Sequence, residues 1–309
     1  VQIYNWVRNN VEWIPTWGAA QDADVTLGSK RGNAMDIASL LIALLRASDI
    51  PARYAHGAIE VPADKFMNWA GGFTDVKAAG DYASSGGVPI TGIVSGGRIA
   101  KFQMEHVWVE AAVDFLPSRG AINKSADSWV GLDASYKQYE YLQGLDVVAT
   151  SGIDPNGVAQ VFAQTTTSNP AEGWVSGLDI SVLTNAQTQA QASLQAHLET
   201  MTNPTVGSVI GGRRIVTRAT GVLPTSLPAR QLAIGARYAT LPTALQNIYG
   251  LGFGLDIFGE ANLAAAFPLP RVNNHKLTLS FRPATVVDEQ TLASLLPSGS
   301  GTDPSQMPS

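Results

Sequence analysis

The 309-residue sequence contains no cysteine and only four histidines. Without cysteine the chain forms neither a disulfide bond nor a thiolate metal site, and so few histidines argue against a zinc site. The absence of cysteine fits an exported protein, in which a stray thiol is a liability. It fits equally a sequence whose single cysteine was replaced.

Charged residues are also scarce, at 15%, and the formal net charge is −5. Binding to phosphate requires concentrated lysine and arginine, so we expect no nucleic acid as the main partner. No run of 18 apolar residues is present, which predicts no membrane span. The sequence begins at Val1 without a methionine or a signal peptide. We therefore expect a piece of a larger protein. The absence of cysteine and the Gly-, Ser- and Thr-rich composition favour an exported one, extracellular or periplasmic.

The most informative stretch that is present is Gly32-Asn33-Ala34-Met35-Asp36 and the apolar segment behind it. Residues 37–48 place apolar side chains at the spacing of one buried helix face. Gly32-Asn33 is a turn signal, so Ala34 should lie where a loop enters this helix. Unpaired N–H groups and the positive end of the helix dipole point outward there, and they would activate a thiol. The sequence has alanine at this position.

Residues 52–61, 105–115 and 129–133 are typical of strands. The Gly-, Ala- and Ser-rich residues 63–100 are interpreted as an insertion or a lid over a cleft. A helix followed by antiparallel strands predicts an α+β domain over residues 1–150.

The length favours a second domain. After residue 150, short apolar runs between Gly and Pro predict a β-rich accessory module over residues 151–296, with a helix near 185–201. The composition of residues 297–309 is that of a disordered tail.

Four segments of residues 1–140 together resemble the transglutaminase-like superfamily, which has the papain-like fold of cysteine acyltransferases and peptidases. They occur in the order expected of that family: Arg31 to Leu41, Ile50-Pro51-Ala52-Arg53-Tyr54, His106-Val107-Trp108-Val109-Glu110, and Trp129-Val130-Gly131-Leu132-Asp133. The resemblance implies a helix packed on an antiparallel sheet, followed here by the β-rich module.

The resemblance also implies a catalytic triad, in which a thiolate attacks a carbonyl carbon, an imidazole transfers the proton and a carboxylate orients the imidazole. The nucleophile position falls on Ala34, the base on His106 and the orienting carboxylate on Asp133. Trp17 and Gln21 are the two candidates for a side-chain oxyanion donor or substrate contact. This chemistry needs no cofactor and no metal.

Alanine at position 34 departs from the family pattern, and three explanations compete. Ala34 is an engineered replacement of cysteine, or a natural loss that leaves a binding module, or the register is wrong and Ser29 or Ser39 acts instead. Under the first explanation, the function is acyl transfer from a glutamine or peptide carbonyl, with cross-linking, deamidation or peptide cleavage as outcomes. The alternative is a naturally inactive binding or structural module of a larger secreted toxin or surface protein. The expected partner is a protein or peptide substrate, and the C-terminal segment of the same chain is a second candidate.

Overall fold

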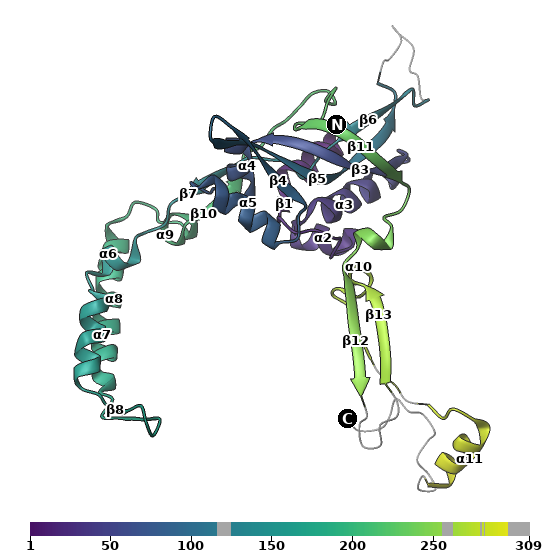
Figure 1. Ribbon diagram of the computed structural model, residues 1–309. Coiled ribbons are helices and arrows are strands. Elements are labelled where there is room, and N and C mark those ends of the chain that lie inside the picture. Colours follow the sequence, from purple (N-terminus) through teal and green to yellow (C-terminus); the bar gives the residue numbers. More distant parts are fainter. Residues whose placement is uncertain (116–124, 255–261, 279, 281, 296–309) are drawn as a thin grey trace.

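The computed structural model describes residues 1–115, 125–254, 262–278, 280 and 282–295. The predicted disordered tail over residues 297–309 lies outside the described residues. The described part has a core of one sheet with helices on it, from which two extended segments project (Figure 1). Within this part, no helix is both long enough and apolar enough to cross a membrane.

The core sheet has five antiparallel strands, with β5 as its longest member. The first half of β5 pairs with β4 and its second half pairs with β6. On its other edge, residues 101–111 of β5 pair with all of β3. The strand β11 adds to the far edge of β3. The bounds are β3 (Ala52–Pro62), β4 (Ile90–Ser95), β5 (Arg98–Val113), β6 (Ser128–Leu132) and β11 (Arg230–Tyr238).

The apolar helix predicted behind Ala34 is α3 (Ala34–Arg46), which packs on β3 and β5. Asn33 caps it, because its side chain accepts hydrogen bonds from the backbone N–H groups of Met35 and Asp36. The carboxylate of Asp36 in turn accepts from the N–H of Asn33. This reciprocal capping box fixes the first residue of the helix at Ala34.

Residues 63–100, interpreted from the sequence as an insertion or lid, form two helices, strand β4 and the start of β5. The helices are α4 (Ala63–Ala70) and α5 (Val76–Ser85). The side chains of Phe66 and Trp69 on α4 are fully buried. This segment therefore contributes large side chains to the hydrophobic core.

The N-terminal residues complete the core. A short parallel pair joins β1 (Glu12–Trp13) to β2 (Arg31–Gly32), so the chain that enters α3 is held beside Trp13. The remaining helices of this region are α1 (Gln2–Asn10) and α2 (Ala23–Ser29). Together these elements form an α+β domain with helices on an antiparallel sheet, as the sequence predicts.

Beyond the core, the chain forms a helical arm that leaves and returns through the pair β7 (Tyr139–Leu142) and β10 (Gly212–Ile215). The predicted helix near 185–201 is present as α8, which starts five residues earlier than expected, at Ile180. The arm contains α6 (Val147–Ser151), α7 (Pro155–Gln164), β8 (Thr167–Asn169), β9 (Trp174–Ser176), α8 (Ile180–Thr200) and α9 (Val206–Ile210).

After β11 the chain forms a hairpin that projects from the core, followed by a short helix (Figure 1). The elements are η1 (Thr243–Leu245), β12 (Ile248–Gly254), β13 (Asn262–Pro268), α10 (Leu269–Val272) and α11 (Val286–Leu295). The region predicted to be β-rich thus contains helices as well as strands. Its strand β11 belongs to the core sheet, so this sheet extends across the boundary predicted at residue 150.

Candidate functional site

The two polar residues singled out on the sheet lie together. His106 is on β5, and Asp133 directly follows β6, the strand that pairs with the second half of β5. His106 Nε2 lies 3.0 Å from Asp133 Oδ2, and the two residues are 1% and 2% exposed. Among the described residues, Nδ1 of His106 has no hydrogen-bond partner, so this nitrogen remains available for a proton transfer.

Asp133 is held by several donors in addition to His106. Its Oδ1 accepts hydrogen bonds from the Ser135 hydroxyl at 2.6 Å and from the backbone N–H groups of Ser135 and Tyr136. Burial by itself would raise the pKa of Asp133, but the neighbouring His106 and the Ser135 hydrogen bonds hold this pKa below its usual value. Asp133 is therefore an ionised carboxylate that fixes the orientation of the imidazole.

Trp69 of α4 covers the imidazole. Its ring meets that of His106 edge-on, with 5.7 Å between the centroids, and stacks on Trp13 at 4.0 Å. Its indole Nε1 donates a hydrogen bond to the carbonyl of Ser135. The same tryptophan thus packs against both the histidine and the loop that carries the aspartate, and it closes this side of the site.

Ala34 is the first residue of α3 and is buried. It lines a narrow void together with other α3 residues, residues 107–109 of β5, and Asp133 and Ser135 of the loop after β6. This void has no room for a water-sized sphere. The structure therefore places Ala34 beside the loop that carries Asp133, in a closed space.

Asp36 lies in the first turn of α3 and is buried as well. Its Oδ1 accepts from the backbone N–H groups of Ala20 and Gln21, which ties the preceding loop to the helix start. Burial raises the pKa of Asp36 to about 6, against the lowering effect of the hydrogen bonds from Gln21, Ala20 and Asn33. Its position agrees with a capping role at the helix start.

The two candidates for the oxyanion donor point elsewhere. The Trp17 ring lies against His56, with 5.9 Å between the centroids. The Gln21 side chain accepts a hydrogen bond from the Ser29 hydroxyl and lines a different cavity, on the outer side of α3. Among the described residues, neither side chain is hydrogen-bonded to His106 or Asp133. Their role as donors stays a prediction.

Sequence reasoning missed three residues that hold the pair in place. Ser135 bonds Asp133 and lies 3.1 Å from His106 Nε2, and Tyr4 of α1 donates from its hydroxyl to the Asp133 carbonyl. Trp69 packs against both the imidazole and the loop that carries Asp133. The signal for Ser135 was its position two residues after Asp133, where a hydroxyl reaches back to a carboxylate.

A buried cation also lies near this loop. Lys137 is fully buried, and its ammonium group donates a hydrogen bond to the Val11 carbonyl. Burial, with the nearby Arg8, lowers the pKa of Lys137 to about 7. Among the described residues, no cluster of three or more His, Asp or Glu side chains is suited to a metal ion.

The combination of a capped helix start, an antiparallel sheet and a histidine–aspartate pair on neighbouring strands defines an α+β domain of the papain-like class. Residues 1–134 match the sequence model of the transglutaminase-like superfamily. This part of the chain is therefore a transglutaminase-like domain. No curated protein and no solved structure matches the chain.

Proposed function

We propose that the transglutaminase-like domain, with alanine at position 34, is a non-catalytic binding module in which the His106–Asp133 pair is structural. One observation carries this proposal: the pair is 1% and 2% exposed beneath Trp69, and the residue at the helix start offers only a methyl group. Acyl transfer requires a nucleophile within reach of both the imidazole and a substrate carbonyl. A methyl group cannot form the acyl–enzyme bond.

The edge of the sheet supports a binding role. Strand β11, from downstream in the same chain, pairs with β3, and two of its arginines form ion pairs with carboxylates of the domain. Arg230 meets Glu60 at 3.1 Å, and Arg237 meets Glu110 at 2.8 Å. The addition of an extended strand to an exposed sheet edge is a recurring mode of peptide recognition. The partner in this proposal is an extended protein segment, for which the chain's own residues 230–238 are the example.

A second candidate function is thiol acyl transfer by a chain that carries cysteine at position 34. It is favoured by the free Nδ1 of His106, because Asp133 occupies the other ring nitrogen. A cysteine at the start of α3 would also lie where the helix dipole stabilises a thiolate. The substrate class would be a glutamine or peptide carbonyl.

The two candidates are separated by the labelling rate of an introduced thiol. Ala34→Cys and the control Ala38→Cys both place a thiol on the buried face of α3, but only position 34 is at the helix start. Iodoacetamide alkylation is followed by mass spectrometry, each variant with and without His106→Gln. Slow labelling at position 34, similar to position 38 and independent of His106, is expected for the binding module. Rapid labelling that is lost with His106→Gln would refute the structural role of the pair and favour the acyl-transfer candidate.

A further inference from the structure

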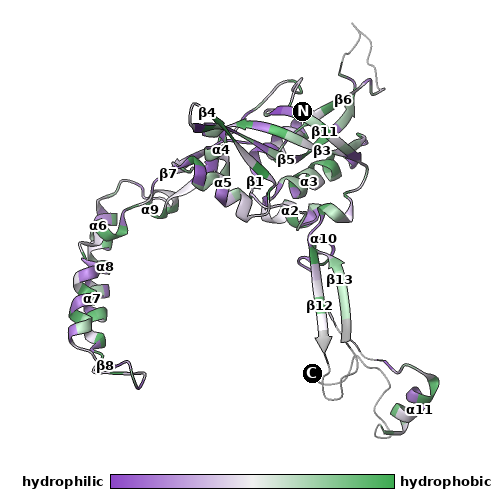
Figure 2. Cartoon of the chain, viewed as in Figure 1, coloured by the Kyte–Doolittle hydropathy of each residue, from purple (hydrophilic) through white to green (hydrophobic). Residues whose placement is uncertain are grey.

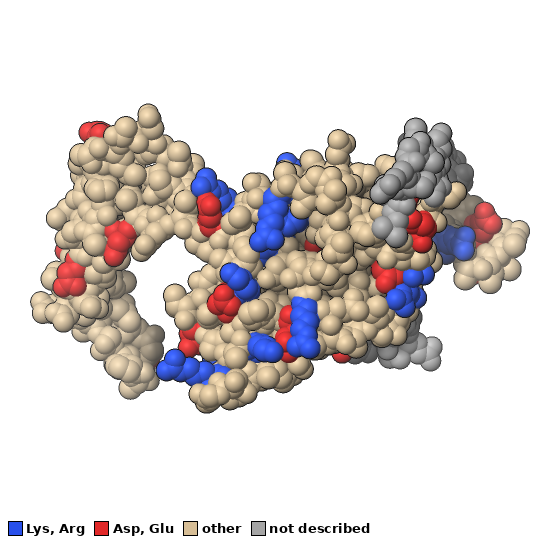
Figure 3. Space-filling model, turned by 90° about the horizontal axis from the view of Figure 1, so that it is seen from above, with Lys and Arg blue, Asp and Glu red and all other residues tan. Residues whose placement is uncertain are grey.

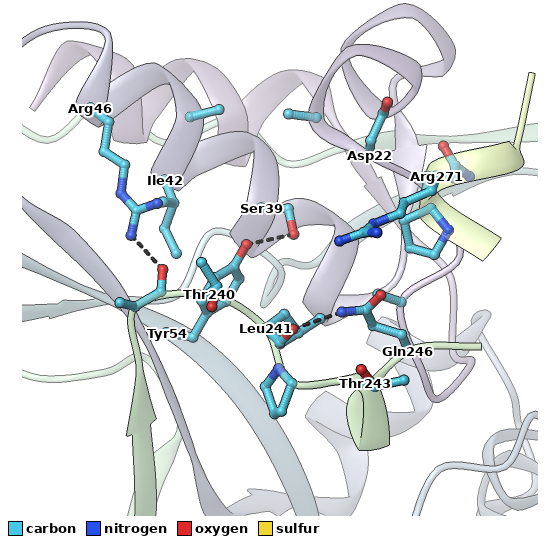
Figure 4. A pocket seen from close by; sticks show the side chains of 17 residues that line it. Asp22, Ser39, Ile42, Arg46, Tyr54, Thr240, Leu241, Thr243, Gln246 and Arg271 are labelled. Carbon is cyan, nitrogen blue, oxygen red and sulfur yellow. Dashed lines mark hydrogen bonds between the residues drawn. The ribbon is translucent and has the colours of Figure 1, made fainter. Parts of the chain in front are cut away.

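A large cavity lies on the outer side of α3, away from the His106–Asp133 pair. Its volume is about 780 Å³, and α3, the loop after β11 and α10 enclose it (Figure 4). Small-molecule sites in proteins range over roughly 300–1,000 Å³ and combine apolar walls with a few polar groups. This cavity has both features, since Ile42 and Leu241 face the same space as Ser39 and Arg271.

Arg271 of α10 extends its guanidinium group into the cavity (Figure 4). Among the described residues it has neither a hydrogen-bond partner nor an ion-pair partner. The second guanidinium on the wall is already occupied, because Arg46 donates to the carbonyls of Ala52 and Ala239. Arg271 is therefore the cation with free hydrogen-bond donors in this cavity.

Some of the other polar side chains on the wall are already hydrogen-bonded, and two threonine hydroxyls are not. Tyr54 donates its hydroxyl proton to Ser39, and Ser39 donates to the Met35 carbonyl. The hydroxyls of Thr240 and Thr243 have no hydrogen-bond partner among the described residues. The one carboxylate on the wall, that of Asp22, caps α2 by accepting from the N–H of Val25. A ligand in this space thus meets unused donors, which favour an anion.

We propose that this cavity binds a small organic carboxylate, whose head pairs with Arg271 and whose apolar body lies along Ile42 and Leu241. A guanidinium group offers two parallel N–H donors that match the two oxygens of a carboxylate. The apolar wall residues provide contact for a short hydrocarbon chain. The proposal concerns a site separate from the transglutaminase-like pair and does not depend on the function of that pair.

The test compares hexanoate with hexanamide, which differ only in the charge and geometry of the head group, by isothermal titration of the full chain. Arg271→Gln removes the proposed partner. Arg98→Gln is the matched control, because Arg98 is equally an exposed arginine but lies at the start of β5, outside the cavity. Hexanoate should bind about tenfold or more tightly than hexanamide, as expected for a charge-assisted hydrogen bond.

Arg271→Gln should lower the affinity for hexanoate to that for hexanamide. Arg98→Gln should leave the affinity for hexanoate unchanged. Both substitutions are on exposed side chains, and circular dichroism verifies that the variants are folded. Three results would each overturn the proposal: absence of hexanoate binding, equal affinity for the acid and the amide, or an unchanged affinity in Arg271→Gln. Equal losses of hexanoate affinity in Arg271→Gln and Arg98→Gln would also overturn the proposal, since they would indicate a general effect of net charge.

Discussion

The transglutaminase-like core and the helical arm formed by α6 to α9 differ strongly in the burial of their longest helices. In the core, α3 has 13 residues and nine of them are buried. In the arm, α8 has 21 residues and none is buried. Figure 2 shows apolar residues distributed along the exposed arm helices. Helices of this length gain most of their stability from packing, so the two regions must depend on different sources of stability.

The two regions also differ in charge. Residues 138–212 contain no lysine or arginine, whereas their acids are Glu140, Asp146, Asp154, Glu172, Asp179 and Glu199. Lys/Arg and Asp/Glu side chains lie next to one another over the core, while acids without neighbouring cations mark the arm (Figure 3). The core joins distant segments through such pairs, as in Arg213 with Glu12. The comparison indicates that the arm has local capping interactions but few ties to the rest of the protein.

The largest effect is expected where the core is most tightly packed. Trp69→Ala removes a fully buried ring that stacks on Trp13 and covers His106. It should lower the free energy of unfolding by about 3–5 kcal/mol, the usual cost of such a cavity. The arm control Trp174→Ala alters a side chain that is 43% exposed. It should change stability by less than about 0.5 kcal/mol.

Urea unfolding of the full chain, followed by circular dichroism, measures both variants. Similar losses of unfolding free energy for Trp69→Ala and Trp174→Ala would contradict the difference between core and arm. The exposed tryptophan would then contribute to stability as much as a core residue does.

The next largest effect concerns the buried pair. Asp133→Asn removes one charge from a buried histidine–aspartate contact and should cost about 3 kcal/mol at neutral pH. The pKa of Asp133 is lower in the folded state than in the unfolded chain. The contribution of Asp133 to the free energy of unfolding is therefore fully present above the unfolded-state pKa, near 3.8. This contribution is lost as the pH falls through the lower folded-state pKa.

The difference in stability between the parent and Asp133→Asn should thus shrink below about pH 4. Asp179→Asn in the arm is the control, because asparagine caps a helix about as well as aspartate. Unfolding curves between pH 3 and pH 7 are the measurement. A pH-independent difference would contradict the assignment of an ionised Asp133.

A smaller effect is expected at the junction between β3 and β11. A Cβ atom on Gly57 would overlap the carbonyl oxygen of Ala233 and touch the Trp108 ring. Gly57→Ala should therefore cost about 1–3 kcal/mol through overpacking. Gly250→Ala on the projecting hairpin meets no atom within 4 Å and serves as the control. An equal response of the two glycines in unfolding experiments would show that β11 is not tightly seated on β3.

The parts of the fold that the sequence predicts are those with a local signal. The period of the apolar residues and the turn at Gly32-Asn33 place α3 correctly, and the capping box explains why it begins at Ala34. The family resemblance singles out His106 and Asp133, and the structure places His106 Nε2 3.0 Å from Asp133 Oδ2. Strand β5 begins earlier than expected, at Arg98, because the residues before 105 pair with β4 across the turn at Gly96-Gly97.

The parts that the sequence does not predict depend on contacts between distant segments. Strand β11 pairs with β3 across about 170 residues of sequence, and an alternating pattern does not identify its partner strand. The same limit applies to the site. Trp17 and Gln21 precede the helix start as a donor should, but their orientation is set by His56 and Ser29, which local sequence does not specify.

The smallest effect, and the sharpest test of the comparison, is expected from removal of the outer part of the arm, which contains α7 and α8. The arm leaves and returns at one place, where the Leu145 N–H donates to the Val209 carbonyl and β7 pairs with β10. A short Gly/Ser linker in place of residues 153–201 therefore bridges a small gap. Since α7 and α8 bury no residue, this deletion should change the unfolding free energy of the core by less than about 0.5 kcal/mol. A loss comparable to that of Trp69→Ala would instead mean that the arm belongs to the cooperative unit of the core, despite its exposed surface.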